Sequence, residues 1–378
     1  MRPADTDELM QIIADAVASG GRLELRGGGS KSDIGAPHEA AVVDMTGFSG
    51  VIDYDPAELV LTAGAGTPLA EIEVLVAGQG QMLAFEPFDH GPIFGRASGS
   101  ATLGGVIAAG VSGSRRVSKG AARDHLLGFK AVSGRGETFV GGAKVVKNVT
   151  GYDLPKLLTG SWGRLAALTE VTVKVLPRAQ VTLTLVLEGL EPGAAQAAMS
   201  LAMGSQADVA AAAHAPGLTA FRLEGFGPSV TARHAALAAL LDGVGEVRAL
   251  PDIEAQAFWR SLRELDALND GRPLWRVSVP ASRSCQVIDV LDPLGALWLM
   301  DWAGGLVWLT FDGEPAAVRR AAEAVGGHAM LVRGPERLRA GTPALHPQAL
   351  GVRALEARVR RAFDPSGVFE TGRFIDAD

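Results

Sequence analysis

The sequence predicts a two-domain α+β protein, and three observations support this prediction. Two glycine-rich runs, Ser100–Gly120 and Lys147–Gly163, lie in the first half of the chain. Near Pro177 the pattern changes to strands that alternate with alanine-rich helices. The chain then closes with an amphipathic segment and a further cluster of turn residues. Because glycine lets backbone N–H groups approach a ligand closely, we expect the first half to wrap around a large ligand.

The composition is that of an ordinary globular protein with ample core. The chain has 378 residues, of which 20% are charged and 47% are hydrophobic. Its net charge of −7 argues against a general nucleic-acid binder. The single cysteine, Cys285, excludes an intrachain disulfide and a cysteine-ligated iron–sulfur cluster within this chain. The acidic N-terminal segment lacks the pattern of a signal peptide, and no apolar run reaches membrane-spanning length. We therefore expect a cytoplasmic location.

The elements of the first half follow from apolar spacing and turn residues. Asp5 or Thr6 is expected to cap a first helix, which Gly20 and Gly21 end. Thr67 is expected to cap a second helix. Asp153 is expected to cap a short helix at Leu154–Leu158. Strands are expected at residues 23–25, 41–44, 51–54, 59–62, 129–132, 137–140 and 168–176.

The second half combines strands with alanine-rich helices. Residues 297–309 are expected to form a hairpin that turns at Ala303–Gly305, and 350–363 a last amphipathic helix. A domain boundary is expected near residues 177–180. Five of the six tryptophans lie in this half, where core packing or a protein interface is a simpler role than a ligand cage. Further helices are expected at residues 194–203, 231–241 and 316–325.

The first glycine loop, Arg26–Ser32, follows a predicted strand. Its successive backbone amides can form an anion-binding nest, to which Ser30 and Lys31 add a hydroxyl and a charge. A plain glycine-rich turn is the alternative. No G-x-x-x-x-G-K-[ST] motif occurs, which disfavours a P-loop nucleotide hydrolase.

The second glycine-rich segment, Ala101–Gly110, is predicted to form a short helix of small residues. Its N-terminus would place free N–H groups beside a ligand. The alternative is a helix whose small residues serve tight packing. The seven histidines show no metal-binding spacing, so no metal site is expected.

Taken in order, these motifs resemble the flavin-binding domain of vanillyl-alcohol oxidase-type and D-2-hydroxyacid dehydrogenase-type flavoproteins. Arg26–Ser32 is similar to their first pyrophosphate loop, Ala101–Gly120 to their second flavin-cradling segment, and Lys147–Leu168 to their K-N-x-x-G-Y-D-L element. Phe363–Arg373 resembles their closing F-D-P turn, with Glu370-Thr371 in place of Asn-Pro.

Within that group, the chain is most similar to the GlcE-type FAD-binding subunits of bacterial glycolate oxidases. The segments Pro273–Pro280, Asp301–Leu309 and Gly327–Arg333 carry this resemblance, together with the length of the chain. It implies a bipartite PCMH-type FAD-binding domain at 1–177, a smaller antiparallel-sheet cap at 178–349, and a helix and tail at 350–378 that complete the FAD site.

The resemblance also implies the cofactor and its contacts. Flavinylated relatives carry a histidine at or just after the first glycine loop, where Ser30 and Lys31 stand here, so the FAD is expected to be noncovalent. The residues expected to bind it are Arg26, Gly27, Gly28, Gly29, Ser30, Lys31, Ser32, Pro87, Ala101, Thr102, Gly104, Gly105, Gly110, Ser112, Gly113, Gly120, Asp124, Lys147, Asn148, Gly163, Leu165, Leu168 and Gly372.

The function that the resemblance implies is that of a glycolate oxidase (glycolate dehydrogenase) subunit. Such a complex would oxidise glycolate to glyoxylate, with a larger flavoprotein subunit, an iron–sulfur subunit, and membrane contact only through the complex. The chain lacks the G-D-G-N-L-H-type element and the histidine cluster of stand-alone 2-hydroxyacid dehydrogenases, and no catalytic residue is assigned. The alternatives are a self-sufficient 2-hydroxyacid dehydrogenase and an assembly subunit that does not turn over flavin.

Overall fold

The computed structural model describes residues 1–142 and 151–375. Lys147 and Asn148, two of the expected FAD contacts, lie outside these described residues. The chain divides into two compact units. Unit 1 comprises residues 1–113, 120–178 and 347–378, and unit 2 comprises residues 114–119 and 179–346. Each unit therefore combines segments that are distant in the sequence.

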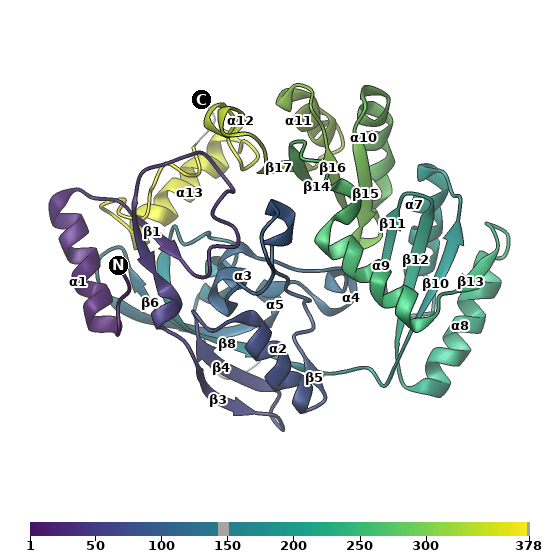
Figure 1. Ribbon diagram of the computed structural model, residues 1–378, viewed down its shortest axis with the longest axis horizontal. Helices are drawn as coiled ribbons and strands as arrows, with labels where there is room; N and C mark the ends of the chain where they lie inside the picture. Colours follow the sequence, from purple (N-terminus) through teal and green to yellow (C-terminus); the bar gives the residue numbers. More distant parts are fainter. Residues whose placement is uncertain (143–150, 376–378) are drawn as a thin grey trace. The chain divides into compact units, whose positions relative to one another are not determined.

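Unit 1 is built on a five-stranded antiparallel sheet in the order β3-β4-β8-β6-β7 (Figure 1). Two short strands, β1 and β2, form a separate parallel pair, and β5 pairs with β9. The bounds are β1 Leu23–Arg26, β2 Ala41–Asp44, β3 Val51–Asp55, β4 Val60–Gly64, β5 Gln81–Met82, β6 Leu126–Ser133, β7 Thr138–Gly142, β8 Ala166–Lys174 and β9 Leu176–Pro177.

Two of these strands begin earlier than predicted. β6 starts at Leu126 instead of residue 129, and β8 starts at Ala166 instead of residue 168. The added residues are held by strand pairing, since Leu126 pairs with Val173 and Ala166 pairs with Ser133. Alanine has a weak intrinsic preference for strands, so only the neighbouring strand reveals that residue 166 belongs to one.

The helices of unit 1 are α1 Thr6–Ser19, α2 Leu69–Gly78, α3 Leu103–Ala109, α5 Ala122–His125, α6 Leu154–Leu158 and α13 Leu350–Phe363. The predicted caps of α1 and α6 are confirmed: Asp5 accepts from Glu8 N–H, and Asp153 accepts from Lys156 N–H. The predicted cap of α2 is wrong. Thr67 hydrogen-bonds Gly50 and the carbonyl of Gly64 instead, because the strand β4 ends in a tight turn beside it.

Unit 2 is an eight-stranded antiparallel sheet in the order β13-β10-β12-β11-β15-β16-β14-β17. The predicted hairpin is confirmed as β15 and β16, joined by a turn at Trp302–Gly304. The strand bounds are β10 Val181–Glu188, β11 Val209–Ala215, β12 Leu218–Gly225, β13 Val247–Ala249, β14 Leu274–Ser278, β15 Leu297–Asp301, β16 Leu306–Thr310 and β17 His328–Arg333.

One face of this sheet carries the main core of unit 2. Side chains such as Trp275 and Val277 pack there against helices α7, α8, α10 and α11. The helix α9 packs on the opposite face, beside Val186 and Ala220. The helices are α4 Arg116–Lys119, α7 Pro192–Met203, α8 Gly227–Leu241, α9 Asp252–Glu264, α10 Ser284–Leu291, α11 Pro315–Ala324 and α12 Glu336–Gly341. In the described ranges, no helix has both the length and the apolar character needed to cross a bilayer.

Candidate functional site

The first glycine loop leaves strand β1 at Arg26 and passes close to the segment that precedes α3. A Cβ atom on Gly28 would overlap the backbone carbonyl of Ser100, and one on Gly27 would overlap the Thr102 hydroxyl. Gly29 adopts a left-handed conformation with φ of 76°. The glycines are therefore required by close backbone approach and by the turn.

This loop presents unused backbone donors. Within the part of the chain that the structure describes, the N–H groups of Gly28, Gly29, Ser30 and Lys31 donate to no protein acceptor. A row of successive N–H groups in a turn is a site for an anion, because it concentrates partial positive charge. The loop therefore has the properties of the predicted nest.

Lys31 adds a full positive charge to the same loop. Its side chain is 8% exposed and its ammonium donates to Ser30 Oγ at 3.1 Å. Burial lowers the pKa of Lys31 to about 8, against the opposing charge of Asp89 and with a smaller contribution from Arg373. A buried ammonium that lacks a contacting carboxylate is costly, so an anionic ligand would stabilise it.

Asp89 holds the neighbouring segment in place. Its carboxylate accepts hydrogen bonds from the backbone N–H groups of Gly91 (2.7 Å), Gly99 (2.8 Å), Ser100 (2.7 Å) and Ala101 (3.0 Å). Burial opposes ionisation of this group, but these four bonds lower the pKa of Asp89 overall. Asp89 thus positions the Ser100 carbonyl against which Gly28 packs.

The segment before α3 does not have the free donors that the sequence analysis expected. Leu103 N–H donates to Thr67 O at 2.9 Å and Gly104 N–H to Ala65 O at 2.7 Å. Gly105 N–H donates to Thr102 Oγ1 at 3.2 Å. The prediction of free N–H groups at this helix start is therefore wrong, because the turn after β4 and the Thr102 cap already satisfy them.

The two glycines at the start of α3 differ in what surrounds them. A Cβ on Gly104 would lie 2.6 Å from Ala65 Cβ and 2.7 Å from Ala65 O. A Cβ on Gly105 would meet only Thr102 Oγ1, at 2.9 Å. Both glycines line one pocket, but Gly104 also serves tight packing against Ala65, whereas Gly105 has space around it apart from Thr102 Oγ1.

A second turn lies against the other end of α3. Trp162 N–H donates to Ala108 O at 2.8 Å, and Gly160 N–H donates to Ile107 O at 3.1 Å. Trp162 and Gly163 both have positive φ, at 58° and 76°. This conformation is unfavourable for tryptophan, and the contacts with α3 hold it beside the pocket.

The C-terminal tail closes onto the first loop. Arg373 donates to the carbonyls of Ile34, at 2.6 Å, and Lys31. Its guanidinium also lies 5.6 Å from the Trp162 ring centroid. The turn that leads to it is held by Asp364, whose carboxylate accepts from the N–H groups of residues 368 and 369 at 2.9 and 2.8 Å. Residues more than 300 positions apart thus shape one site.

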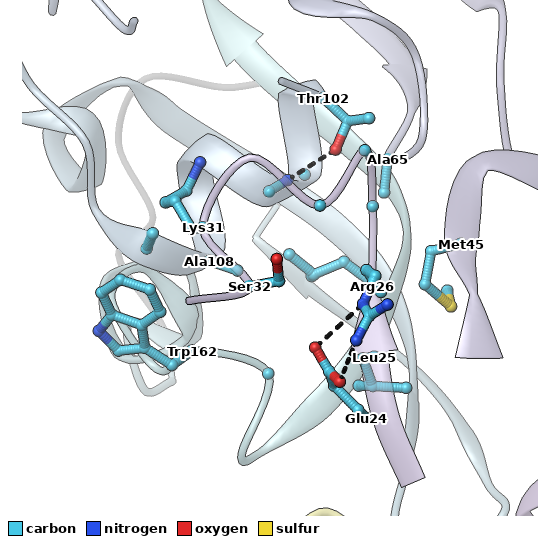
Figure 2. A pocket seen from close by; sticks show the side chains of 18 of the residues that line it. Glu24, Leu25, Arg26, Lys31, Ser32, Met45, Ala65, Thr102, Ala108 and Trp162 are labelled. Carbon is cyan, nitrogen blue, oxygen red and sulfur yellow. Dashed lines mark hydrogen bonds and ion pairs between the residues drawn. The ribbon is translucent and has the colours of Figure 1, made fainter. Parts of the chain in front are cut away.

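These segments surround one pocket in unit 1, shown in Figure 2 with the first loop arched beside the start of α3. Many of the predicted FAD contacts line it, namely Arg26, Gly27, Gly28, Gly29, Ser30, Lys31, Ser32, Thr102, Gly104, Gly105, Gly163 and Leu168. The lining also includes residues that the sequence analysis did not select, which are Glu24, Leu25, Met45, Ala65, Ala108, Ala109, Trp162, Ala166 and Arg373.

Two of the residues that were not predicted could have been identified from the sequence. Trp162 stands between glycine turns, and Arg373 directly follows Gly372 in the closing motif. Glu24 had no such signal. Its role appears only in the structure, where its carboxylate accepts from Arg26 at 3.1 and 2.6 Å and lies 3.3 Å from His38 Nε2. This pairing occupies the Arg26 guanidinium.

The remaining predicted contacts lie outside the lining of this pocket. Leu165 is part of the core of unit 1, and Gly110 ends α3 with a φ of 65°. Ser112 accepts from Ala122 N–H, and Asp124 accepts from Ala121 N–H. The others outside the lining are Pro87, Ala101, Gly113, Gly120 and Gly372.

The pocket has the donor set that FAD would require. The unused N–H groups of residues 28–31 and the Lys31 ammonium suit a negatively charged pyrophosphate. The small residues Gly105, Ala108 and Ala109 and the Trp162 ring supply an apolar wall for a flat ring system. The residues present therefore fit this cofactor.

The fold and the pocket define an FAD-binding protein with a p-cresol methylhydroxylase-like fold. Residues 1–142 match the family described as FAD binding domain. The crystal structure of p-cresol methylhydroxylase with substrate bound superposes with a TM-score of 0.71 at 14% identity, covering 99% of this chain and 88% of that one.

Sequence comparison narrows this class. The glycolate oxidase subunit GlcE of Escherichia coli is 35% identical over 370 residues, which are 97% of this chain and 96% of the relative. The chain belongs to this GlcE family of FAD-dependent oxidoreductases. The D-lactate dehydrogenase of Archaeoglobus fulgidus is 31% identical over 179 residues, which are 47% of this chain and 38% of the relative.

Proposed function

We propose that the chain is the FAD-binding subunit of a multi-subunit glycolate oxidase that oxidises glycolate to glyoxylate. The observation that carries this proposal is the end-to-end match to a relative named as a glycolate oxidase subunit. The pocket in unit 1 supports the proposal, since its backbone N–H groups and the Lys31 ammonium suit FAD. Purification of the native complex and assay of glycolate-dependent dye reduction test the proposal, and a complex that reduces no dye with glycolate would contradict it.

Unit 1 would hold the FAD, and unit 2 would be the cap. In this proposal the N–H groups of Gly28–Lys31 and the Lys31 ammonium bind the pyrophosphate, while Gly105, Gly163 and Leu168 bound the ring system. Bound FAD supplies the capacity to accept two electrons from a 2-hydroxy acid. The protein supplies orientation, exclusion of water and the positive charge of Lys31.

The FAD would be bound without a covalent link. Ser30 and Lys31 occupy the position at which flavinylated relatives carry a histidine. Acid precipitation of the purified protein should release the yellow chromophore into the supernatant. Colour retained in the precipitate would contradict this part of the proposal.

The partners would be a larger flavoprotein subunit and an iron–sulfur subunit. With Cys285 as its single cysteine, the chain cannot hold a cysteine-ligated cluster that would carry electrons away from the flavin. Electrons would therefore leave through partner subunits, and the complex would contact the membrane through them. Affinity purification from native cells, followed by identification of co-purifying chains, tests this assignment.

Activity should depend on these partners. We expect the isolated, FAD-loaded chain to oxidise glycolate far more slowly than the complex. Anaerobic mixing with glycolate or D-lactate measures bleaching of the flavin absorbance. A rate equal to that of the complex would favour the second candidate, a self-sufficient 2-hydroxyacid dehydrogenase, which the half-length similarity to a D-lactate dehydrogenase supports.

A further inference from the structure

Unit 2 contains an arginine, Arg276, whose guanidinium contacts an aromatic ring but forms no ion pair within the described residues. Arg276 lies in the middle of β14, and its neighbours Trp275 and Val277 point into the core, so that its own side chain extends from the opposite face of the sheet. In the described part of the chain, its guanidinium makes no hydrogen bond and no ion pair. Its contact is the ring of Trp302, whose centroid lies 5.0 Å away.

Other arginines of the same sheet are paired. Arg248 donates to Glu188 at 2.6 Å, and Arg333 donates to the carbonyl of Leu268 at 2.9 Å. Arg222 lies 3.7 Å from Glu224 and 4.3 Å from the Trp259 ring centroid. A partly buried guanidinium without an ion pair loses hydration and gains little in return. Arg276 therefore differs from these other arginines, which are paired with a carboxylate or a carbonyl.

A second cation lies on the same tryptophan. The guanidinium of Arg116, from α4, is 4.1 Å from the Trp302 ring centroid. The pKa of Arg276 is lowered to about 10, mainly by burial and also by the positive charge of Arg116, while Asp301 opposes both effects. The guanidinium groups of Arg276 and Arg116 thus lie against the same ring, and the carboxylate of Asp301 acts on the charge of Arg276.

The tryptophan is held in an unfavourable conformation. Trp302 and Ala303 both have positive φ, at 53° and 55°, and Gly304 follows at 95°. Asp301 fixes this turn, since its carboxylate accepts from Trp302 N–H at 2.7 Å and from Ser114 Oγ at 2.9 Å. Such strain persists only where the surroundings impose it, and it places the ring beside Arg276 and Arg116.

We propose that Arg276 binds the carboxylate of a small 2-hydroxy acid on this face of unit 2, with Trp302 shielding the contact and Arg116 adding positive charge. The planar fork of a guanidinium matches a carboxylate in two parallel hydrogen bonds. This inference rests on the proposed oxidation of a 2-hydroxy acid and names the residue that recognises it.

A binding experiment tests the site without turnover. The probe is oxalate, a carboxylate that the enzyme cannot oxidise as a 2-hydroxy acid, added to the full-length, FAD-loaded protein. We expect saturable quenching of tryptophan fluorescence and a higher Tm. Arg276→Gln should weaken oxalate binding about tenfold or more, the effect of losing a charge-assisted bidentate contact.

Two further variants make the result specific. Arg276→Lys keeps the charge but lacks the fork, and it should bind oxalate with intermediate affinity. Arg248→Gln removes an exposed arginine of the same sheet that pairs with Glu188, and it should leave oxalate binding unchanged. Without ligand, Arg276→Gln should melt close to the unmodified protein, because it removes the contact with the Trp302 ring but, within the described residues, no hydrogen bond or ion pair. A clear fall in its Tm would show a structural role and overturn the proposal.

The remaining outcomes separate this inference from the proposed function. Equal oxalate affinity in Arg276→Gln and the unmodified protein would overturn it, as would tighter binding of inorganic phosphate than of oxalate. If the complex oxidises glycolate with an unchanged KM in Arg276→Gln, the function stands and this inference fails. If oxalate binding needs Arg276 but glycolate is not oxidised, the inference stands and the proposed substrate is wrong.

Discussion

The two glycine-rich segments of unit 1 look alike in the sequence but differ in their backbone donors. In the first loop, the N–H groups of Gly28–Lys31 are unused within the described chain. At the start of α3, Leu103, Gly104 and Gly105 donate to protein acceptors. Glycine content therefore does not identify an anion site. What identifies it is the number of donors left after the protein has satisfied its own acceptors.

The largest effect is expected from the first loop. Gly28→Ala would force a Cβ into the Ser100 carbonyl, so that the loop could not keep its shape. We expect the variant to lose FAD during gel filtration, measured as the ratio of flavin to protein absorbance. Gly78→Ala is the matched control, because a Cβ there meets nothing within 4 Å. Full flavin content in Gly28→Ala would mean that FAD binding does not depend on this conformation of the loop.

A pair of variants at α3 separates packing from ligand contact. Gly104→Ala crowds Ala65 and should lower the free energy of unfolding by about 1–3 kcal/mol, measured by urea denaturation. Gly105→Ala meets only Thr102 Oγ1, at 2.9 Å, so this capping hydroxyl must shift and the loss of stability should be smaller than in Gly104→Ala. Its FAD affinity should fall, since Gly105 lines the pocket. Equal effects of the two substitutions on both quantities would remove the distinction between these glycines.

Loss of the Lys31 charge should weaken FAD binding without weakening the fold. Lys31→Met is expected to raise the Kd of FAD about 10- to 100-fold, the usual range for a charge-assisted contact. The FAD-free variant should melt no lower than the unmodified protein, because a buried ammonium is replaced by an apolar group. Lys130→Met, at an exposed ion pair, serves as the control. An unchanged Kd would place the cofactor phosphates elsewhere.

The smallest expected effect is a pH dependence. The FAD-free protein holds the pKa of Lys31 at about 8, and a bound phosphate would raise it. Above pH 8, FAD binding would then take up a proton, so the Kd should rise by up to about tenfold per pH unit. Below pH 8 the lysine is already charged and this contribution is constant. Titration of FAD from pH 7 to 9.5 should show the rise in the unmodified protein and a flatter curve in Lys31→Met.

Burial of the same lysine should also lower the stability of the FAD-free protein at neutral pH. Its folded pKa of about 8 lies below its ordinary value of 10.5, so between these values the unfolded chain binds more protons. The cost of burying the charge is fully present below pH 8 and disappears as the pH rises toward 10.5. The stability advantage expected of Lys31→Met at pH 7 should shrink over this window.

Much of the local structure could be predicted because it depends on near neighbours in the chain. The Asp5 cap and Gly20 end of α1, the limits of α13 and the hairpin β15–β16 all agree with the apolar spacing and turn residues. The likeness of the ordered glycine motifs to flavoproteins also indicated the fold and FAD, and both are confirmed.

The sequence by itself thus determined the elements, the glycine loops and the cofactor. Only the tertiary structure decided which donors remain open, that Thr67 serves a turn instead of capping α2, and that Arg276 forms no ion pair within the described residues. The physical reason is the distance along the sequence over which each kind of interaction acts. Helix periodicity and capping act over about four residues, whereas hydrogen-bond satisfaction depends on contacts such as Gly104 with Ala65 or Arg373 with Lys31, which the chain brings together only when it folds.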